Sequence, residues 1–165
     1  MIQYNIAVLE GDGIGPEIVN QAIKVLNKVS DKCGFRVDYT FSDVGGVAID
    51  KYKTPLPEDT LNNCKNSDSI LLGSVGGAKW DYLPLKQRPE SAILKIRKEF
   101  SLFAGVKPLS VFNSLKDMSL LKRENIQKFK DILIVSDLTG GIYVGEKARR
   151  FDNGKIFAFD TEMYR

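Results

Sequence analysis

The sequence has no histidine among its 165 residues. Within this chain, that excludes catalytic triads built on imidazole and any histidine metal ligand. Cysteine is scarce as well, because only Cys33 and Cys64 occur. Two thiols so far apart are too few for a zinc site, and they suit reduced, structural cysteines. Proton transfer on this chain must therefore use tyrosine, lysine, aspartate or glutamate.

Long apolar runs are also missing, since no stretch approaches the ~20 residues that span a membrane. The first nine residues lack the basic start of a signal peptide, so we expect a cytoplasmic protein with no membrane partner. The net charge is +3, and the 24 basic residues are spread along the chain. A nucleic-acid-binding module normally has a dense basic stripe, so that class of protein is disfavoured.

Short apolar runs alternate with segments of helical periodicity along most of the chain. The pattern predicts strands over 5–10, 35–41, 68–73, 103–112 and 131–135, the first, the third and the last of them buried. It predicts helices over 16–33, 57–64, 90–100 and 115–129. Pro16 suits the first turn of the first helix, and Gly34 suits its end. This alternation of strands and helices predicts an α/β architecture.

The sequence pattern changes after Thr139. Apolar residues there flank a polar stretch that contains Asn153-Gly154, a strong signal for a two-residue hairpin turn. We expect a projecting hairpin over about residues 140–160. No further core element follows it in the sequence. We therefore expect this chain to be a fragment of a longer protein.

Gly11 and Gly13 stand between the first strand and the first helix, as in a dinucleotide-binding fingerprint. However, Pro16 occupies the place of the third glycine. Proline has no N–H to offer a pyrophosphate, and its ring fills space that close helix–strand packing needs. The segment therefore predicts a tight strand-to-helix turn, and the fold is not expected to be a Rossmann fold.

Three long blocks occur in one order: residues 11–17, residues 72–81 followed by 88–90 and 96–98, and residues 131–135 followed by 138–146. In sequence and spacing they resemble the N-terminal portion of the 3-isopropylmalate dehydrogenases, in the isocitrate/isopropylmalate dehydrogenase family. The resemblance implies that family's α/β fold in incomplete form. It implies the N-terminal part of a first domain over 1–103 and the start of a second over 104–165. The hairpin would be a dimerisation arm, so a homodimer is expected.

The resemblance implies NAD-dependent oxidation and decarboxylation of 3-isopropylmalate to 4-methyl-2-oxopentanoate in leucine biosynthesis, with Mg²⁺ or Mn²⁺. The family's metal ligands, catalytic lysine and adenosine-binding loop are expected beyond residue 165, so this chain alone should be inactive. Two alternatives remain open: another β-decarboxylating dehydrogenase, acting on tartrate or homoisocitrate, and a catalytically impaired copy or pseudoenzyme.

The resemblance also assigns roles to residues. Tyr143 corresponds to the catalytic tyrosine that protonates the enol, and its glycine neighbours suggest close approach of a ligand. Arg97 corresponds to a substrate-binding arginine. Glu90, Ile93 and Leu94 correspond to positions that meet the γ-substituent, where two aliphatic side chains suit an isopropyl group. Ordinary core packing is the competing interpretation of that helical face.

The cofactor site implied by the resemblance is the loop after the third predicted strand. It comprises Gly77, Ala78, Lys79, Trp80 and Asp81, which would lie near the nicotinamide together with Glu90.

Two positions depart from the family pattern. Lys107 and Ser136 stand where the family has substrate-binding arginines. Lysine keeps the charge but loses the bidentate geometry of the guanidinium, whereas serine keeps neither charge nor reach. The departures predict weakened activity, an altered substrate or a decayed gene copy.

Overall fold

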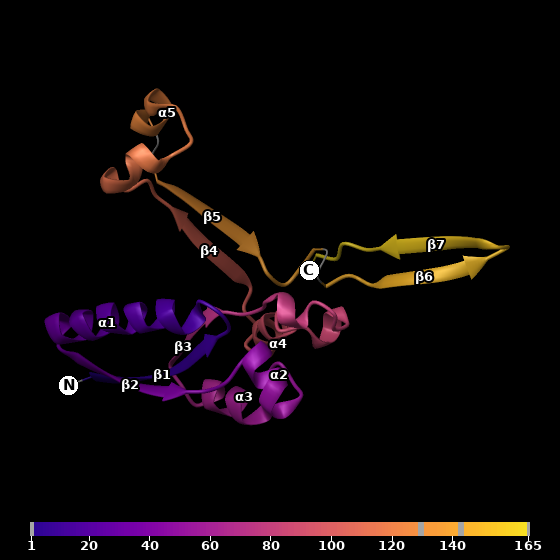
Figure 1. Ribbon diagram of the computed structural model, residues 1–165, viewed down its shortest axis with the longest axis horizontal. Coiled ribbons are helices and arrows are strands. Elements are labelled where there is room, and N and C mark those ends of the chain that lie inside the picture. Colours follow the sequence, from indigo (N-terminus) through magenta and orange to yellow (C-terminus); the bar gives the residue numbers. More distant parts are fainter. Residues whose placement is uncertain (1, 129–130, 142–143, 165) are drawn as a thin grey trace. The chain divides into compact units, whose positions relative to one another are not determined.

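The computed structural model describes residues 2–128, 131–141 and 144–164 (Figure 1). The chain divides into two compact units, residues 1–96 and 97–165. The domain boundary after residue 103 stays a prediction.

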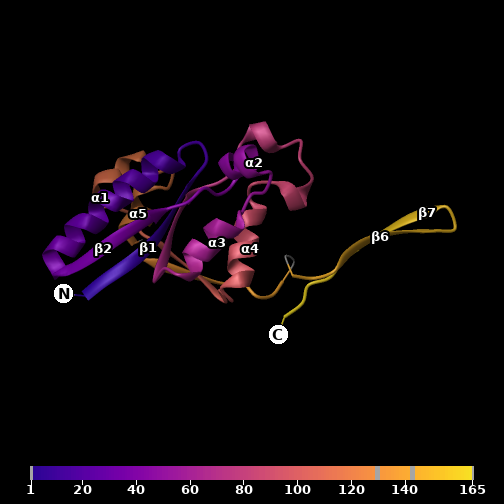
Figure 2. The same cartoon turned by 90° about the horizontal axis from the view of Figure 1, so that it is seen from below.

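The first unit is built on a parallel sheet of three strands in the order β2-β1-β3. The strands are β1 (Ile2–Gly11), β2 (Phe35–Phe41) and β3 (Ser69–Ser74). Helix α1 (Gly15–Cys33) connects β1 to β2 and packs on the sheet. Figure 2 shows α1 and α3 on either side of β1. These elements confirm the α/β class and the strands predicted in this part of the chain. The prediction that the third strand is buried is wrong, because β3 is half-buried from Ile70 onward.

The ends of α1 follow the local signals in the sequence. Pro16 lies in the first turn, and the helix stops where Gly34 adopts a left-handed conformation with φ 76°. The N–H of Gly34 donates to the carbonyl oxygen of Ser30 at 2.9 Å, which satisfies one of the last carbonyls of the helix. Both predicted boundaries are therefore confirmed.

Three further helices follow: α2 (Gly46–Tyr52), α3 (Glu58–Lys65) and α4 (Ser91–Glu99), of which α4 belongs to the first unit up to Ile96. Short 3₁₀ turns at Ala78–Trp80 and Leu85–Gln87 lie between β3 and α4. The sequence did not predict α2, because Gly45-Gly46 looks like a break. Gly45 does lie outside the helix with φ 79°, yet the helix begins directly at Gly46.

The buried core lies almost entirely in the first unit. Its apolar members are Ala7, Val8, Leu9, Val19, Val44, Ala48, Leu56, Leu61, Cys64, Ala92 and Ile96. In the described part of the second unit, Ile126 is the buried hydrophobic residue. The first unit therefore has a core of its own.

The second unit contains an antiparallel pair, β4 (Ala104–Leu109) and β5 (Ile132–Asp137). The prediction that β5 is a buried strand is wrong. Leu133 and Val135 are 61% and 64% exposed, and Ile132 and Ile134 on the other face are 47% and 46% exposed. An apolar run is typical of a buried strand, but burial also needs partner elements on both faces.

The single helix predicted over 115–129 is also wrong for the described residues. A 3₁₀ turn (Asn113–Met118) and the short helix α5 (Arg123–Lys128) replace it. Ser119 is extended between them, and its hydroxyl accepts a hydrogen bond from the N–H of Leu121 at 3.2 Å. Such a local side-chain bond competes with the helical hydrogen bonds. Phe129 lies outside the described residues.

The predicted hairpin is confirmed as β6 (Lys147–Asp152) and β7 (Lys155–Asp160). Asn153 and Gly154 form its turn with φ 46° and 75°, the left-handed values that a type I′ turn requires. All residues of both strands are exposed.

Candidate substrate and cofactor site

The buried carboxylate of Asp12 joins three segments of the first unit. It accepts hydrogen bonds from the N–H groups of Gly46 at 2.7 Å, Val47 at 2.8 Å and Gly76 at 2.8 Å. Its side chain is almost inaccessible, because Asp12 is only 2% exposed. Asp12 thus holds the start of α2 and the glycine loop after β3. The sequence alone did not reveal this role of Asp12. An acidic residue inside a glycine turn is the feature that could have indicated it.

The glycine turn itself is the strand-to-helix turn that the sequence predicted. The N–H of Gly15 donates to the backbone oxygen of Asp12 at 2.8 Å. A Cβ atom on Gly15 would overlap the carbonyl oxygen of Glu10, so the helix can start this close to β1 only with glycine there. Packing within the chain therefore explains the glycine at this position.

Replacing Asp12 by alanine is expected to destabilise the chain by about 3 kcal/mol, because three largely buried N–H groups lose their acceptor. The measurement is urea unfolding followed by circular dichroism. Asp68→Ala is the matched control, since its carboxylate accepts one exposed bond, from the N–H of Asn5 at 2.7 Å. Equal losses in the two variants would contradict the role given to Asp12.

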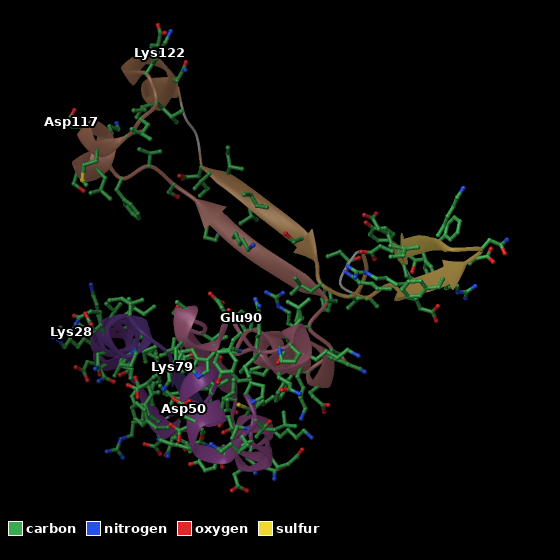
Figure 3. The ribbon with its side chains drawn as sticks, turned by 45° about the vertical axis from the view of Figure 1, so that its right-hand side comes forward. Lys28, Asp50, Lys79, Glu90, Asp117 and Lys122 are labelled. Atoms are coloured by element: carbon green, nitrogen blue, oxygen red, sulfur yellow. The ribbon has the colours of Figure 1, made fainter. Side chains whose placement is uncertain are left out.

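The predicted cofactor loop is attached to α2 through Asp50. Lys79 Nζ lies 2.5 Å from Asp50 Oδ2, and Trp80 Nε1 donates to Asp50 Oδ1 at 3.2 Å (Figure 3). The hydrogen bond from Lys79, and then that from Trp80, lower the pKa of Asp50 below its ordinary value. The stabilisation from these bonds is therefore present at neutral pH and is lost as the pH falls through the lowered pKa. The sequence alone did not indicate Asp50 as a partner of this loop, because Asp50 is 29 residues away from Lys79 in the chain.

Asp81, the last residue of the predicted cofactor loop, faces Arg88. Its carboxylate lies 3.9 Å from Arg88 Nη1, and its backbone oxygen accepts a hydrogen bond from Arg88 Nη2. Arg88 Nε also donates to the backbone oxygen of Leu83 at 3.0 Å. These contacts hold the two ends of the segment 81–88 together.

Glu90 lies directly against the glycine loop. A Cβ atom on Gly76 would overlap Glu90 Oε1, so the structure brings the carboxylate onto the backbone of that loop. The structure thus brings Glu90 next to Gly76, the residue before the predicted cofactor loop, and its role at the cofactor and the substrate stays a prediction.

The helical face that follows Glu90 is not core. Ala92 and Ile96 are the buried residues of α4, at 0% and 5% exposure, whereas Leu94 is 44% exposed and Ile93 is half-buried. Core packing therefore does not explain Leu94. Arg97 lies in the last turn of the same helix and is half-buried.

Lys107 and Ser136 lie on one face of the β4-β5 pair. Ser136 is opposite Gly105, and Lys107 is opposite Ile134, so the two are diagonal neighbours across the strands. The structure thus brings together the two positions that depart from the family pattern. Tyr143, the predicted catalytic tyrosine, lies outside the described residues.

The glycines around Tyr143 have a structural explanation. The N–H of Gly141 donates to the backbone oxygen of Met163 at 2.8 Å. A Cβ atom on Gly145 would overlap the backbone oxygen of Thr161. These glycines allow the returning chain to pass closely, and so they do not by themselves indicate a ligand.

A cavity of about 420 Å³ in the first unit does not coincide with the predicted site. It lies at the ends of β1 and β2, and none of the predicted site residues line it. One wall is Asp43, whose carboxylate already binds Lys51 Nζ at 2.9 Å and the hydroxyl of Tyr52 at 3.1 Å.

Among the described residues, no group of three or more acidic or cysteine side chains is placed to hold a metal ion. In the same part of the chain, no helix is both long and apolar enough to cross a membrane.

Comparison with known proteins matches almost the whole chain. The 3-isopropylmalate dehydrogenase of Clostridium acetobutylicum is 50% identical over 164 residues, which cover 99% of this chain and 46% of that protein. That of Aquifex aeolicus is also 50% identical and covers 99% of this chain and 45% of its own length. The chain therefore spans less than half the length of these relatives.

Solved structures agree with the fold. The isocitrate dehydrogenase of Methylococcus capsulatus superposes with a TM-score of 0.70 at 26% identity, covering 98% of this chain and 43% of that one. A β-decarboxylating dehydrogenase of Thermococcus kodakarensis superposes with a TM-score of 0.65 at 24% identity, covering 97% and 41% of the two chains. The sequence profile that matches residues 5–165 is described as isocitrate/isopropylmalate dehydrogenase. The chain belongs to the isocitrate/isopropylmalate dehydrogenase family.

Proposed function

We propose that this chain provides the substrate-facing part of an NAD-dependent 3-isopropylmalate dehydrogenase of leucine biosynthesis. The observation that carries the proposal is the face of α4, where Leu94 is exposed and Ile93 half-exposed beside Glu90, which itself lies on the glycine loop. An aliphatic surface next to a carboxylate and a backbone loop suits an isopropyl group better than a third carboxylate. The identity to dehydrogenases with that name supports the same substrate.

The substrate is a dianion, which needs cationic partners. In this proposal, Arg97 and Lys107 bind its carboxylates, and Ser136 contributes only a hydroxyl. The loop Gly77 to Asp81 would lie at the nicotinamide end of NAD, which would supply the hydride acceptor for C2. The proton of the C2 hydroxyl would pass to a base outside this chain, for which we propose the catalytic lysine. Cleavage of the C3–carboxylate bond would release carbon dioxide and leave an enolate, and Tyr143 would donate its phenolic proton to C3, which gives 4-methyl-2-oxopentanoate.

The family's Mg²⁺ or Mn²⁺ does not fit the described residues, because they offer no ligand cluster. We place its ligands beyond residue 165, together with the catalytic lysine and the adenosine-binding loop. The exposed β6-β7 hairpin would pair with a second copy in a homodimer, and we propose a cytoplasmic location.

The test uses two proteins. One is this chain alone, and the other is the completed enzyme, meaning residues 1–165 extended to the relatives' length. The extension comes from the chain's own downstream reading frame or from the C-terminal part of the Clostridium acetobutylicum relative. NAD reduction is followed with Mn²⁺ and 3-isopropylmalate, isocitrate, homoisocitrate or tartrate. We expect the completed enzyme to prefer 3-isopropylmalate and the chain alone to be inactive. Preference for another acid would refute the substrate, and turnover by the chain alone would refute the placement of the missing groups.

Lys107 and Ser136 favour a second candidate, a copy that binds substrate without turning it over. Isothermal titration of the completed enzyme with 3-isopropylmalate and Mn²⁺ distinguishes the two. Binding with no NADH formed supports the impaired copy.

A further inference from the structure

We propose that Asp50 is a positioning residue that holds the Gly76–Asp81 loop in the shape that the nicotinamide end of NAD requires. The proposal rests on the function proposed above. It adds a residue on α2 that carries no ligand itself and acts only through Lys79 and Trp80.

The first observation is that Asp50 uses both of its carboxylate oxygens on this loop. Oδ2 binds the Lys79 ammonium at 2.5 Å, and Oδ1 accepts the indole N–H of Trp80 at 3.2 Å. The ammonium also lies 5.3 Å from the centre of the Trp80 ring, within the range of a cation–π contact. Two successive side chains of the loop are thus held by one carboxylate.

The second observation is independent of charge. A Cβ atom on Gly46 would overlap the ring of Trp80, so the indole rests directly on the first residue of α2. Gly46 is itself held by Asp12, which also binds the N–H of Gly76 at the other end of the loop. One end of the loop is therefore attached directly to α2, and the other end is attached to the start of that helix through Asp12.

The consequence concerns Lys79. Its charge faces Asp50 and the indole, so it is committed to the protein rather than to a cofactor phosphate. Lys79 and Trp80 would then act on NAD by fixing the backbone around Gly77, close to Glu90. Losing Asp50 should alter cofactor binding more than the binding of the dicarboxylate, whose proposed partners lie on other elements.

An exposed ion pair alone usually contributes little. The competing explanation is therefore that Asp50, which is 44% exposed in its side chain, is an ordinary surface partner of Lys79. Lys51 provides the matched control, because it lies on the same helix and forms a similar exposed pair with Asp43 at 2.9 Å without contacting the loop.

The first measurement uses this chain and its single tryptophan, Trp80. Asp50→Ala should shift the indole emission to the red and increase its quenching by acrylamide. Gly46→Ala should do the same, because the added methyl group displaces the ring. Lys51→Ala should leave both unchanged. Circular dichroism confirms that each variant is folded. Unchanged emission in folded Asp50→Ala would overturn the proposal.

The second measurement uses the completed enzyme. We expect Asp50→Ala to raise the KM for NAD by about tenfold, as misplacement of a binding loop can, with little change in the KM for 3-isopropylmalate. Asp50→Glu should recover part of the loss, and Lys51→Ala should behave as the parent enzyme. Equal changes in both KM values, or none in either, would show a structural role only and refute the positioning role.

The two measurements separate this proposal from the proposed function. If the parent enzyme turns over a different hydroxy acid, the function fails, but the emission shift and the KM for NAD with that acid still test Asp50. If 3-isopropylmalate is the substrate and the KM for NAD is unaffected, only the role of Asp50 fails.

Discussion

Replacing Lys107 and Ser136 together by arginine is expected to raise kcat/KM of the completed enzyme for 3-isopropylmalate by roughly a hundredfold. The reason is geometric. The two positions are diagonal neighbours on one face of β4-β5, so two guanidinium groups there can meet the same dianion. Ser136 is opposite Gly105, which has no side chain to obstruct a longer residue at 136.

The two single variants should contribute unequally to this gain in kcat/KM. Ser136→Arg should account for most of the gain because it adds a charge, whereas Lys107→Arg adds only bidentate geometry. The double variant Lys122→Arg with Ser110→Arg makes the same two exchanges at exposed positions outside that face, and should change nothing. No gain in the first double variant would mean that Lys107 and Ser136 do not limit the activity of this protein.

Replacing Tyr143 by phenylalanine should lower kcat of the completed enzyme by about 10²–10⁴-fold, the usual contribution of a positioned general acid. The chain has no histidine to replace the phenol as proton donor. Phenylalanine keeps the ring, so the KM for 3-isopropylmalate should change little. Steady-state kinetics over a range of pH measure both quantities.

Tyr164→Phe is the matched control for that experiment. Tyr164 is 66% exposed, and its hydroxyl donates a hydrogen bond to Glu162 Oε2 at 3.4 Å. We expect its kcat to equal that of the parent enzyme. A loss of similar size in both tyrosine variants would show that Tyr143 stabilises the fold and is not the acid.

Local signals were sufficient wherever the determinants of structure lie close together in the chain. The end of α1 follows from Gly34, whose left-handed conformation costs glycine little. The hairpin turn follows from Asn153-Gly154 for the same reason. The rejection of a Rossmann site required only Pro16. Each of these features depends on the backbone preferences of one or two residues.

Features that depend on distant partners were not predictable. Helix α2 has only seven residues and begins at a glycine, and its first N–H groups are bound by Asp12 from 34 and 35 residues away. The exposure of β5 could not be predicted either, because an apolar run does not reveal whether other elements cover it. The prediction of one helix over 115–129 failed where the hydroxyl of Ser119 makes a local bond.

The same distinction between local and distant determinants applies to the candidate site. The sequence by itself determined the family, the candidate residues between Gly77 and Tyr143 and the absence of histidine chemistry, because these depend on residue identity and order. Only the tertiary structure decided that Leu94 is exposed, that Glu90 lies on Gly76, and that Asp50 holds Lys79 and Trp80. Those contacts join residues far apart in the chain, and they arise from packing on the parallel sheet, which no local pattern records.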